Sequence, residues 1–292
     1  MQFDRLLCPI DFSETSARAF DHAVALARWY DSRVTVIHVP ALLLAPVPGE
    51  GDPLPITRNE LAQRLEDFVA PARTAGVTIE TGLRDGDPVR EILREAEDGA
   101  ANLVVMGTHG RSGFERLVLG SVAEKILRKA RCPVLTIPPG ERSDAPAVQA
   151  GFKAILCATD FSPAAASALD AALRLAQEAD ATLTILHVVE AHFGDVAEAG
   201  ASYLENLEQA ARVRLASAVP AGARTWCTVV ERVERGRARH VIVQVAEECE
   251  AGVIVMGAHG SHALDRLIFG STTHRVIHEA GRPVLTLPSS AA

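Results

Sequence analysis

The sequence repeats itself across its two halves, which strongly limits the folds it can adopt. A glycine pattern of the form G-x2-G-x9-G-S occurs at 107–121 and again at 257–271. The segment L-L-C-P-I-D-F-S at 6–13 corresponds to I-L-C-A-T-D-F-S at 155–162, and the halves close on P-V-L-T-I-P and P-V-L-T-L-P. Because the spacing between the copies is nearly constant, the pattern indicates a duplicated domain rather than a short-period solenoid.

The segment between the copies has the composition of a linker. It reads P-P-G-E-R-S-D-A-P-A-V-Q-A-G and is rich in residues that break helices and strands. A chain of 292 residues with 48% hydrophobic residues is long and apolar enough for two cores. We therefore expect a first domain over 1–138, a linker over 139–151 and a second domain over 152–292.

Each half alternates short apolar runs with helical patterns. The runs lack polar alternation, which is typical of parallel strands covered on both faces. Expected strands are 5–10, 34–39, 77–83, 103–106 and 134–137, then near 153–158, 183–188, 226–231, 253–256 and 284–287; expected helices of the first half are 13–30, 58–75, 88–98 and 114–130. The pattern predicts an α/β protein of two tandem Rossmann-like domains, each an open, doubly wound five-stranded parallel sheet with helices on both faces.

Composition excludes several classes of function. The formal net charge of −8 disfavours nonspecific binding to nucleic acid. The five cysteines are odd in number and form no C-x-x-C, which argues against a disulfide framework and a cysteine-based zinc site; we expect Cys8 and Cys157 to be buried small hydrophobes. Neither a signal peptide nor an apolar stretch of transmembrane length is found, so we expect a cytoplasmic protein without a membrane partner.

The glycine pattern has a defined place on this fold. Gly107 and Gly110 follow the fourth strand at its carboxyl end, where open parallel sheets bind ligands. Glycines allow backbone N–H groups to approach an anion. Gly120 and Ser121 can fold back to the same place and present a helix N-terminus to phosphate oxygens.

Two aspartates belong to the same edge of the sheet. Asp11 and Asp160 end the first strand of each half. A carboxylate there can accept hydrogen bonds from ribose hydroxyls, but it could also merely cap the following helix. The sequence leaves both roles open.

The pattern is neither a Walker loop nor the dinucleotide fingerprint G-x-G-x-x-G. It resembles the ATP-binding signature of the universal stress protein family. The resemblance extends over nearly the whole chain and includes P-I-D-F-S and T-D-F-S, the H-V end of the second strand, and the closing P-V-L-T-[IL]-P. The chain looks like a tandem member with two copies.

The resemblance implies an adenine nucleotide (ATP, ADP or AMP, with or without Mg²⁺) bound with little turnover in a stress or dormancy response. Asp11 and Asp160 would face the nucleoside, and Val39 and Val188 would meet adenine largely through the backbone. The implied phosphate contacts are Gly107, Gly110, Gly120, Ser121 and Val122 in the first half, and Gly257, Gly260, Gly270, Ser271 and Thr272 in the second.

The family also suggests how the halves associate. Its single-domain members usually dimerise through the final strand. Here Val134–Ile137 and Val284–Leu287 could pair within the chain and make an intrachain pseudo-dimer. A homodimer of the full chain and a protein partner are left open.

Other residues of the loops do not favour catalysis. His109 and His259 fit a structural role in orienting the loops, while Arg111, which Ser261 replaces in the second half, can pair with a phosphate or remain a solvated side chain. Neither loop contains a lysine, and Ser121 has no evident base, which argues against an efficient kinase, ATPase or hydrolase. We therefore assign no catalytic residue and no metal site. The alternatives are a slow ATPase or adenylyl-transferring enzyme, and a partner-binding scaffold without ligand.

The copies differ at one helix start. G-D-P at 86–88 becomes G-R-A at 236–238. Pro88 suits the first turn of a helix, and Ala238 does not supply its fixed φ. Loop 40–57 is rich in proline and could cover the adenine end of the first site, so base preference can differ between the halves.

Overall fold

The computed structural model describes residues 3–40, 57–110, 119–140, 152–190, 201–259 and 270–288. The first half contains β1 (Arg5–Ile10), α1 (Glu14–Tyr30), β2 (Arg33–His38), α2 (Arg58–Thr74), β3 (Ile79–Leu83), α3 (Pro88–Asp98), β4 (Leu103–Gly107), α4 (Ser121–Lys129) and β5 (Val134–Ile137). The second half contains β6 (Ala154–Ala158), α6 (Pro163–Ala179), β7 (Thr182–Val189), α8 (Ala201–Ala218), a 3₁₀ turn (Ala223–Thr225), β8 (Thr228–Arg235), α9 (Ala238–Glu248), β9 (Val253–Gly257), α10 (Ser271–Glu279) and β10 (Val284–Leu287).

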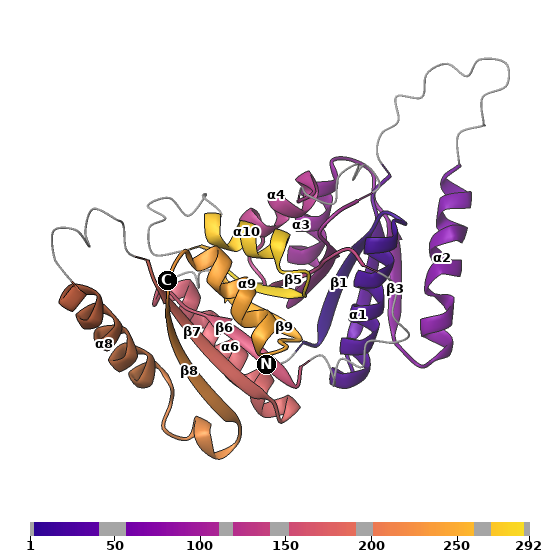
Figure 1. Cartoon of the computed structure of the whole chain (residues 1–292). Coiled ribbons are helices and arrows are strands. Elements are labelled where there is room, and N and C mark those ends of the chain that lie inside the picture. The colour runs from indigo at the N-terminus through magenta and orange to yellow at the C-terminus, as the bar shows by residue number, and fades with distance from the viewer. Residues whose placement is uncertain are drawn as a thin grey trace.

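The strands of both halves form one continuous sheet. Their order is β3-β2-β1-β4-β5-β10-β9-β6-β7-β8. All neighbours within a half are parallel, whereas β5 and β10 are antiparallel, with Leu135 opposite Leu285. Figure 1 shows helices on both faces and α2 and α8 at the two ends. The α/β fold with two Rossmann-like halves of five parallel strands is confirmed, and the two sheets merge into one mixed sheet.

The closing strands join the halves, as the sequence predicted. The Thr136 hydroxyl donates to the carbonyl of Val284 (3.1 Å), and the Thr286 hydroxyl donates to the carbonyl of Val134 (3.2 Å). The two hydrogen bonds are equivalent under the pseudo-two-fold symmetry that relates the halves. Elsewhere Tyr30 of α1 donates a hydrogen bond to Glu178 of α6, so the halves also contact each other through helices.

The core lies in two layers, one on each face of the sheet. Leu6 and Cys8 belong to one cluster of buried side chains and Leu7 belongs to the other, as alternate residues of a strand must. Both clusters contain residues from both halves. Cys8 and Cys157 are completely buried, and burial raises the pKa of both thiols. The prediction that these cysteines are buried small hydrophobes is confirmed.

One expected helix start is wrong. The sequence predicted a helix from 114 to 130, but residues 119 and 120 are not helical and α4 begins at Ser121. The Gly120 N–H donates to the carbonyl of Thr108 (2.8 Å), which turns the chain back toward the end of β4. The separate expectation that Ser121 opens a helix is confirmed; residues 114–118 lie outside the described residues.

In the second half, the equivalent helix is capped by a residue that is distant in the sequence. In the first copy Asp87 caps α3 by accepting from the Arg90 N–H (3.0 Å), and Pro88 occupies the first turn. In the second copy Arg237 provides no side-chain cap. Instead the Ala238 N–H donates to the carboxylate of Glu190 (2.5 Å), which follows β7. None of the described helices combines the length and apolarity needed to cross a membrane.

Candidate functional site

The turn after β1 holds its aspartate in a fixed orientation. Phe12 has a φ of 62°, in the left-handed region that a bulky side chain rarely adopts. This conformation lets the Ser13 N–H donate to Asp11 Oδ1 (3.0 Å). Ser13 is the N-cap of α1 and accepts from the Ser16 N–H (3.2 Å). The role of simple helix cap therefore belongs to Ser13, and the Asp11 carboxylate instead stabilises the turn before the helix.

The second half builds the same turn. Phe161 also has a φ of 62°. The Ser162 N–H donates to Asp160 Oδ1 (3.0 Å), and Ser162 caps α6 by accepting from the Ala165 N–H (3.2 Å). A bulky residue persists in the left-handed region only where surrounding contacts compensate its cost. Both halves retain this conformation at the equivalent phenylalanine.

Two histidines support these turns: His38 is the last residue of β2, and His187 lies near the end of β7. His38 Nδ1 lies 2.8 Å from the carbonyl of Ile10, and His187 Nδ1 lies 2.8 Å from the carbonyl of Thr159. Because a carbonyl only accepts, Nδ1 must carry the proton in both rings. The H-V dipeptide of the sequence did not reveal this role. The signal in the sequence is that both halves contain the histidine on the second strand together with the D-F pair that follows the first strand.

The side chains around the left-handed phenylalanines are also paired. The ring centroids of Phe12 and His38 lie 4.7 Å apart, and those of Phe161 and His187 lie 4.5 Å apart. The Arg64 guanidinium of α2 lies 4.3 Å from the Phe12 centroid, and Arg214 of α8 lies 4.1 Å from that of Phe161. Cation–π contact of this kind attaches the outer helix of each half to its aspartate turn.

The glycine loop after β4 meets the Asp11 carboxylate. A Cβ added at Gly110 would lie 2.6 Å from Asp11 Oδ2, so a side chain at this position would displace the carboxylate. A Cβ at Gly120 would lie 3.1 Å from the carbonyl of Thr108. The structure thus brings Asp11 together with Gly110 and Gly120, about a hundred positions further along the chain, and the sequence assigned all three to one site.

Two other glycines have a packing role. A Cβ at Gly107 would lie 2.8 Å from Thr15 Cγ2, and one at Gly257 would lie 2.9 Å from the Cβ of Ala164. Their small size lets the first turns of α1 and α6 approach the ends of β4 and β9. This explains both glycines without a ligand, and their contact with phosphate stays a prediction.

The helix after each glycine loop begins without a side-chain cap. Gly120 precedes Ser121 and Val122 at the start of α4 and, as the N-cap, has no side chain to cap that helix. Gly270 precedes Ser271 and Thr272 at the start of α10 in the same way. The first N–H groups of a helix have no intrahelical partner and carry the positive end of its dipole, so such a terminus suits an anion.

The histidines of the loops are only partly accounted for. His109 Nδ1 lies 2.9 Å from the Thr108 hydroxyl, which agrees with the expected role in orienting the loop. His259 ends the described part of the second loop. Arg111 and Gly260 lie outside the described residues, so their phosphate contacts stay predictions.

The backbone near the ends of β2 and β7 faces the aspartate turns. Successive peptide groups of a strand face opposite neighbours. The Leu186 carbonyl accepts from Thr159 N–H (2.9 Å) and the Val189 carbonyl accepts from Gly236 N–H (3.2 Å). The Val188 peptide therefore faces β6, toward the Asp160 turn. In the first copy the carbonyl of His38 accepts from Arg84 N–H (3.0 Å) across from β3, so Val39 faces the Asp11 turn.

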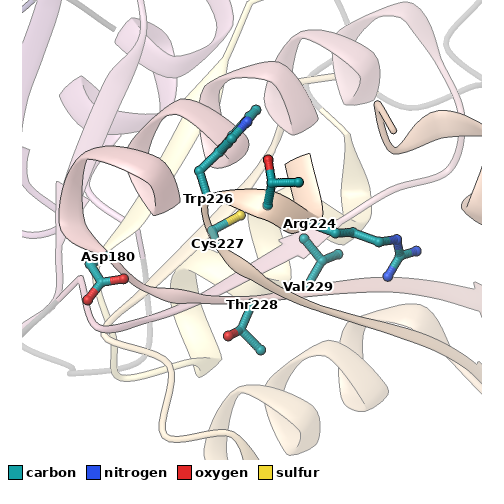
Figure 2. Close-up of a pocket in the computed structure, with 7 residues that line it drawn as sticks. Asp180, Arg224, Trp226, Cys227, Thr228 and Val229 are labelled. Atoms are coloured by element: carbon teal, nitrogen blue, oxygen red, sulfur yellow. The ribbon is translucent and has the colours of Figure 1, made fainter. Parts of the chain in front are cut away.

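A hollow elsewhere on the second half is not part of this site. It has a volume of about 490 Å³ and lies at the amino end of β8 (Figure 2). The lining residues are Asp180, Arg224, Thr225, Trp226, Cys227, Thr228 and Val229. Because parallel strands share their direction, this end is the edge of the sheet opposite to Asp160.

Comparison with known proteins decides the family. The model of the universal stress protein family matches residues 2–138 and again residues 151–288. The chain belongs to the universal stress protein family. A universal stress protein of Mycolicibacterium smegmatis is 26% identical over 294 aligned residues, covering 97% of this chain and 96% of the relative. A universal stress protein of Methanocaldococcus jannaschii is 36% identical over 139 residues, covering 46% of this chain and 82% of the relative.

A solved universal stress protein has the same tandem arrangement. The crystal structure of a universal stress protein from Archaeoglobus fulgidus superposes with a TM-score of 0.68 at 25% identity and covers 99% of this chain and 100% of that chain. The prediction that two tandem universal stress protein domains cover the whole chain is therefore confirmed.

Proposed function

We propose that this universal stress protein binds an adenine nucleotide at the carboxyl edge of each half and acts as a sensor or regulator in a stress response. Membership in the family supports the ligand class. The single observation that carries the proposal is the close approach of the glycine loop to the aspartate turn, because Asp11 Oδ2 lies 2.6 Å from the position that a Cβ of residue 110 would occupy. The proposed ligand is ATP, with one molecule bound in each half.

Each part of the site contributes a different contact to the proposed complex. The carboxylates of Asp11 and Asp160 accept hydrogen bonds from ribose hydroxyls. The accepting atom is Oδ2, because Oδ1 accepts from the N–H of the turn. The backbone of Val39 and Val188 meets adenine. The glycine loops and the N-termini of α4 and α10 hold phosphate oxygens.

The proposed function is binding with little turnover. Phosphoryl transfer requires cations that stabilise charge on the transferred group and a group that orients the nucleophile. The sequence of neither aspartate turn nor glycine loop contains a lysine. Contacts that hold the nucleotide equally well before and during hydrolysis lower its free energy without accelerating the reaction, and this is the role we propose for the glycine loops and the helix termini.

The test is calorimetric titration of ATP into the full chain and into two glycine variants. Gly110→Ala places a methyl group 2.6 Å from Asp11 Oδ2 and should halve the number of nucleotides bound per chain. Gly222→Ala is the matched control, because its new Cβ would meet nothing closer than 3.8 Å and its φ is −74°. Unchanged binding in Gly110→Ala would refute the site.

A second measurement separates the rival functions. Release of inorganic phosphate is followed with ATP in excess. We expect turnover far slower than nucleotide exchange. Steady multiple turnover that Asp11→Asn and Asp160→Asn together abolish would show a slow ATPase or adenylyl-transferring enzyme instead. Absence of any ATP binding would show a scaffold without ligand.

A further inference from the structure

Exposed large hydrophobic side chains are concentrated at the outer end of the second half. Among the described residues they are Tyr203 and Val213 of α8, Trp226, and Val230 of β8, with 40%, 57%, 38% and 40% of their surface exposed. The corresponding end of the first half, formed by α2 and β3, contributes none to this set. Figure 1 shows α8 and β8 together at one extreme of the molecule. The duplicated copies therefore differ in the surface that they present at their ends.

Strand β8 is an edge of the ten-stranded sheet, and its outer side is long. It contains eight residues and pairs only with β7 among the described strands, whereas the opposite edge, β3, contains five residues. The Gly236 N–H donates toward β7. Since peptide groups alternate, the N–H and C=O groups of Val229, Glu231, Val233 and Arg235 face away from β7. An unpaired row of this kind is a template for another strand.

The sequence of the edge is complementary to itself. Residues 231–235 read E-R-V-E-R. In an antiparallel pair, outward-facing residues of one strand must oppose outward-facing residues of the other. A pair centred on Val233 meets this condition and places Glu231 opposite Arg235 and Arg232 opposite Glu234. Moving the centre by one residue places Arg232 opposite Arg232 or Glu234 opposite Glu234, and like charges directly opposite each other are destabilising.

We infer that β8 is a self-association edge, through which two copies of this chain pair antiparallel about a two-fold axis at Val233. All four charged side chains are partly accessible: those of Glu231, Arg232, Glu234 and Arg235 are 24%, 28%, 38% and 53% exposed. Within the chain Arg232 already pairs with Glu234 (2.7 Å). Glu231 pairs with Arg224 and Arg235 pairs with Glu208, so a contact between Glu231 and Arg235 of two copies extends these existing ion pairs. In the dimer two such pairs lie face to face and form an alternating four-charge network.

The same register explains the exposure of Val230. It places Val230 opposite Gly236 of the second copy, where no side chain competes for space. Charged residues on an edge strand normally prevent pairing with other edges. Here they permit one register with one partner, so the edge is selective for a second copy of this chain. This interface is distinct from the β5–β10 junction, which is formed within each chain.

The test is sedimentation velocity of the full chain over a range of concentrations, with two charge-reversal variants. Glu231→Arg and Arg235→Glu each place like charges opposite each other at both symmetric positions, so each should weaken self-association by about tenfold or more. In an equal mixture of the two variants, a mixed dimer has opposite charges facing each other at both symmetric positions, so mixing should restore a dimer. Glu80→Arg on the other edge, β3, is the matched control and should leave the dimer intact.

Hydrogen–deuterium exchange of the unmodified protein provides a readout that does not depend on the variants. The amides of Glu231, Val233 and Arg235 should exchange more slowly at high than at low protein concentration, because pairing occupies them. A wild-type chain that is monomeric at every concentration, a dimer that both single variants retain, or exchange of these amides that does not change with concentration would overturn the proposal.

Discussion

Acid should destabilise this protein partly through one histidine of α1. Burial, with a smaller contribution from the nearby Arg18 guanidinium, lowers the pKa of His22 from 6.5 to about 4. Between these values the unfolded chain binds a proton that the folded protein excludes, so stability rises with pH across this window. The contribution of His22 is therefore fully present above about pH 6.5 and is lost as the pH falls toward 4.

The size of the effect follows from the shift. Each pKa unit corresponds to about 1.4 kcal/mol, so the full shift gives an upper limit of about 3 kcal/mol in the free energy of unfolding. The ring is only partly buried, and solvent screening lowers the expected loss to about 1–3 kcal/mol. Urea unfolding at a series of pH values measures it.

The variant His22→Gln isolates this contribution from that of the carboxylates. It removes the titrating ring and keeps a polar side chain on α1. Wild type should lose more stability than His22→Gln between pH 7 and pH 4, by about 1–3 kcal/mol. Parallel pH profiles for the two proteins would refute the reasoning, because they would show that His22 titrates alike in the folded and unfolded chains.

Two further predictions concern differences between the halves. Glu190→Ala removes the cap of α9 and should lower the free energy of unfolding by about 0.5–2 kcal/mol, measured by urea unfolding, with Asp87→Ala at the equivalent cap of α3 as the comparison; no change with Glu190→Ala would contradict the capping role. The first site should bind ATP more tightly than the second, by several-fold at most, because Arg111 adds a cation that the second loop lacks. Calorimetry should therefore show tighter binding in Gly270→Val, which leaves the first site open, than in Gly120→Val, and the opposite order would disprove the ranking.

The sequence predicted the sheet well because burial dictates it. Apolar runs without polar alternation occur where both faces of a strand are covered, as in β4 and β9, whereas the edge strands β3 and β8 are only partly buried. Each run expected from the sequence overlaps a strand, with differences only at the ends. Those differences also have a cause. Strand β2 ends at His38, and Pro40, two residues on, has no N–H for a ladder, whereas Val189 occupies the equivalent place and β7 continues to pair with β8.

The sequence was less informative about contacts that depend on distant segments. The start of α4 was misplaced because the Gly120 N–H bonds to Thr108, a contact that only the folded loop creates. Local patterns also could not reveal that Glu190 caps α9 across 48 positions of sequence. The duplication compensated for part of this limit, since a feature present in both copies, such as the D-F-S turn, must have a physical cause in each.

The most direct test of the central claim is native mass spectrometry of the purified full chain before and after addition of ATP. We expect species that carry one and then two adenine nucleotides per chain, whether the nucleotide is retained from expression or added. Detection of only the unliganded chain in the presence of excess ATP would contradict it.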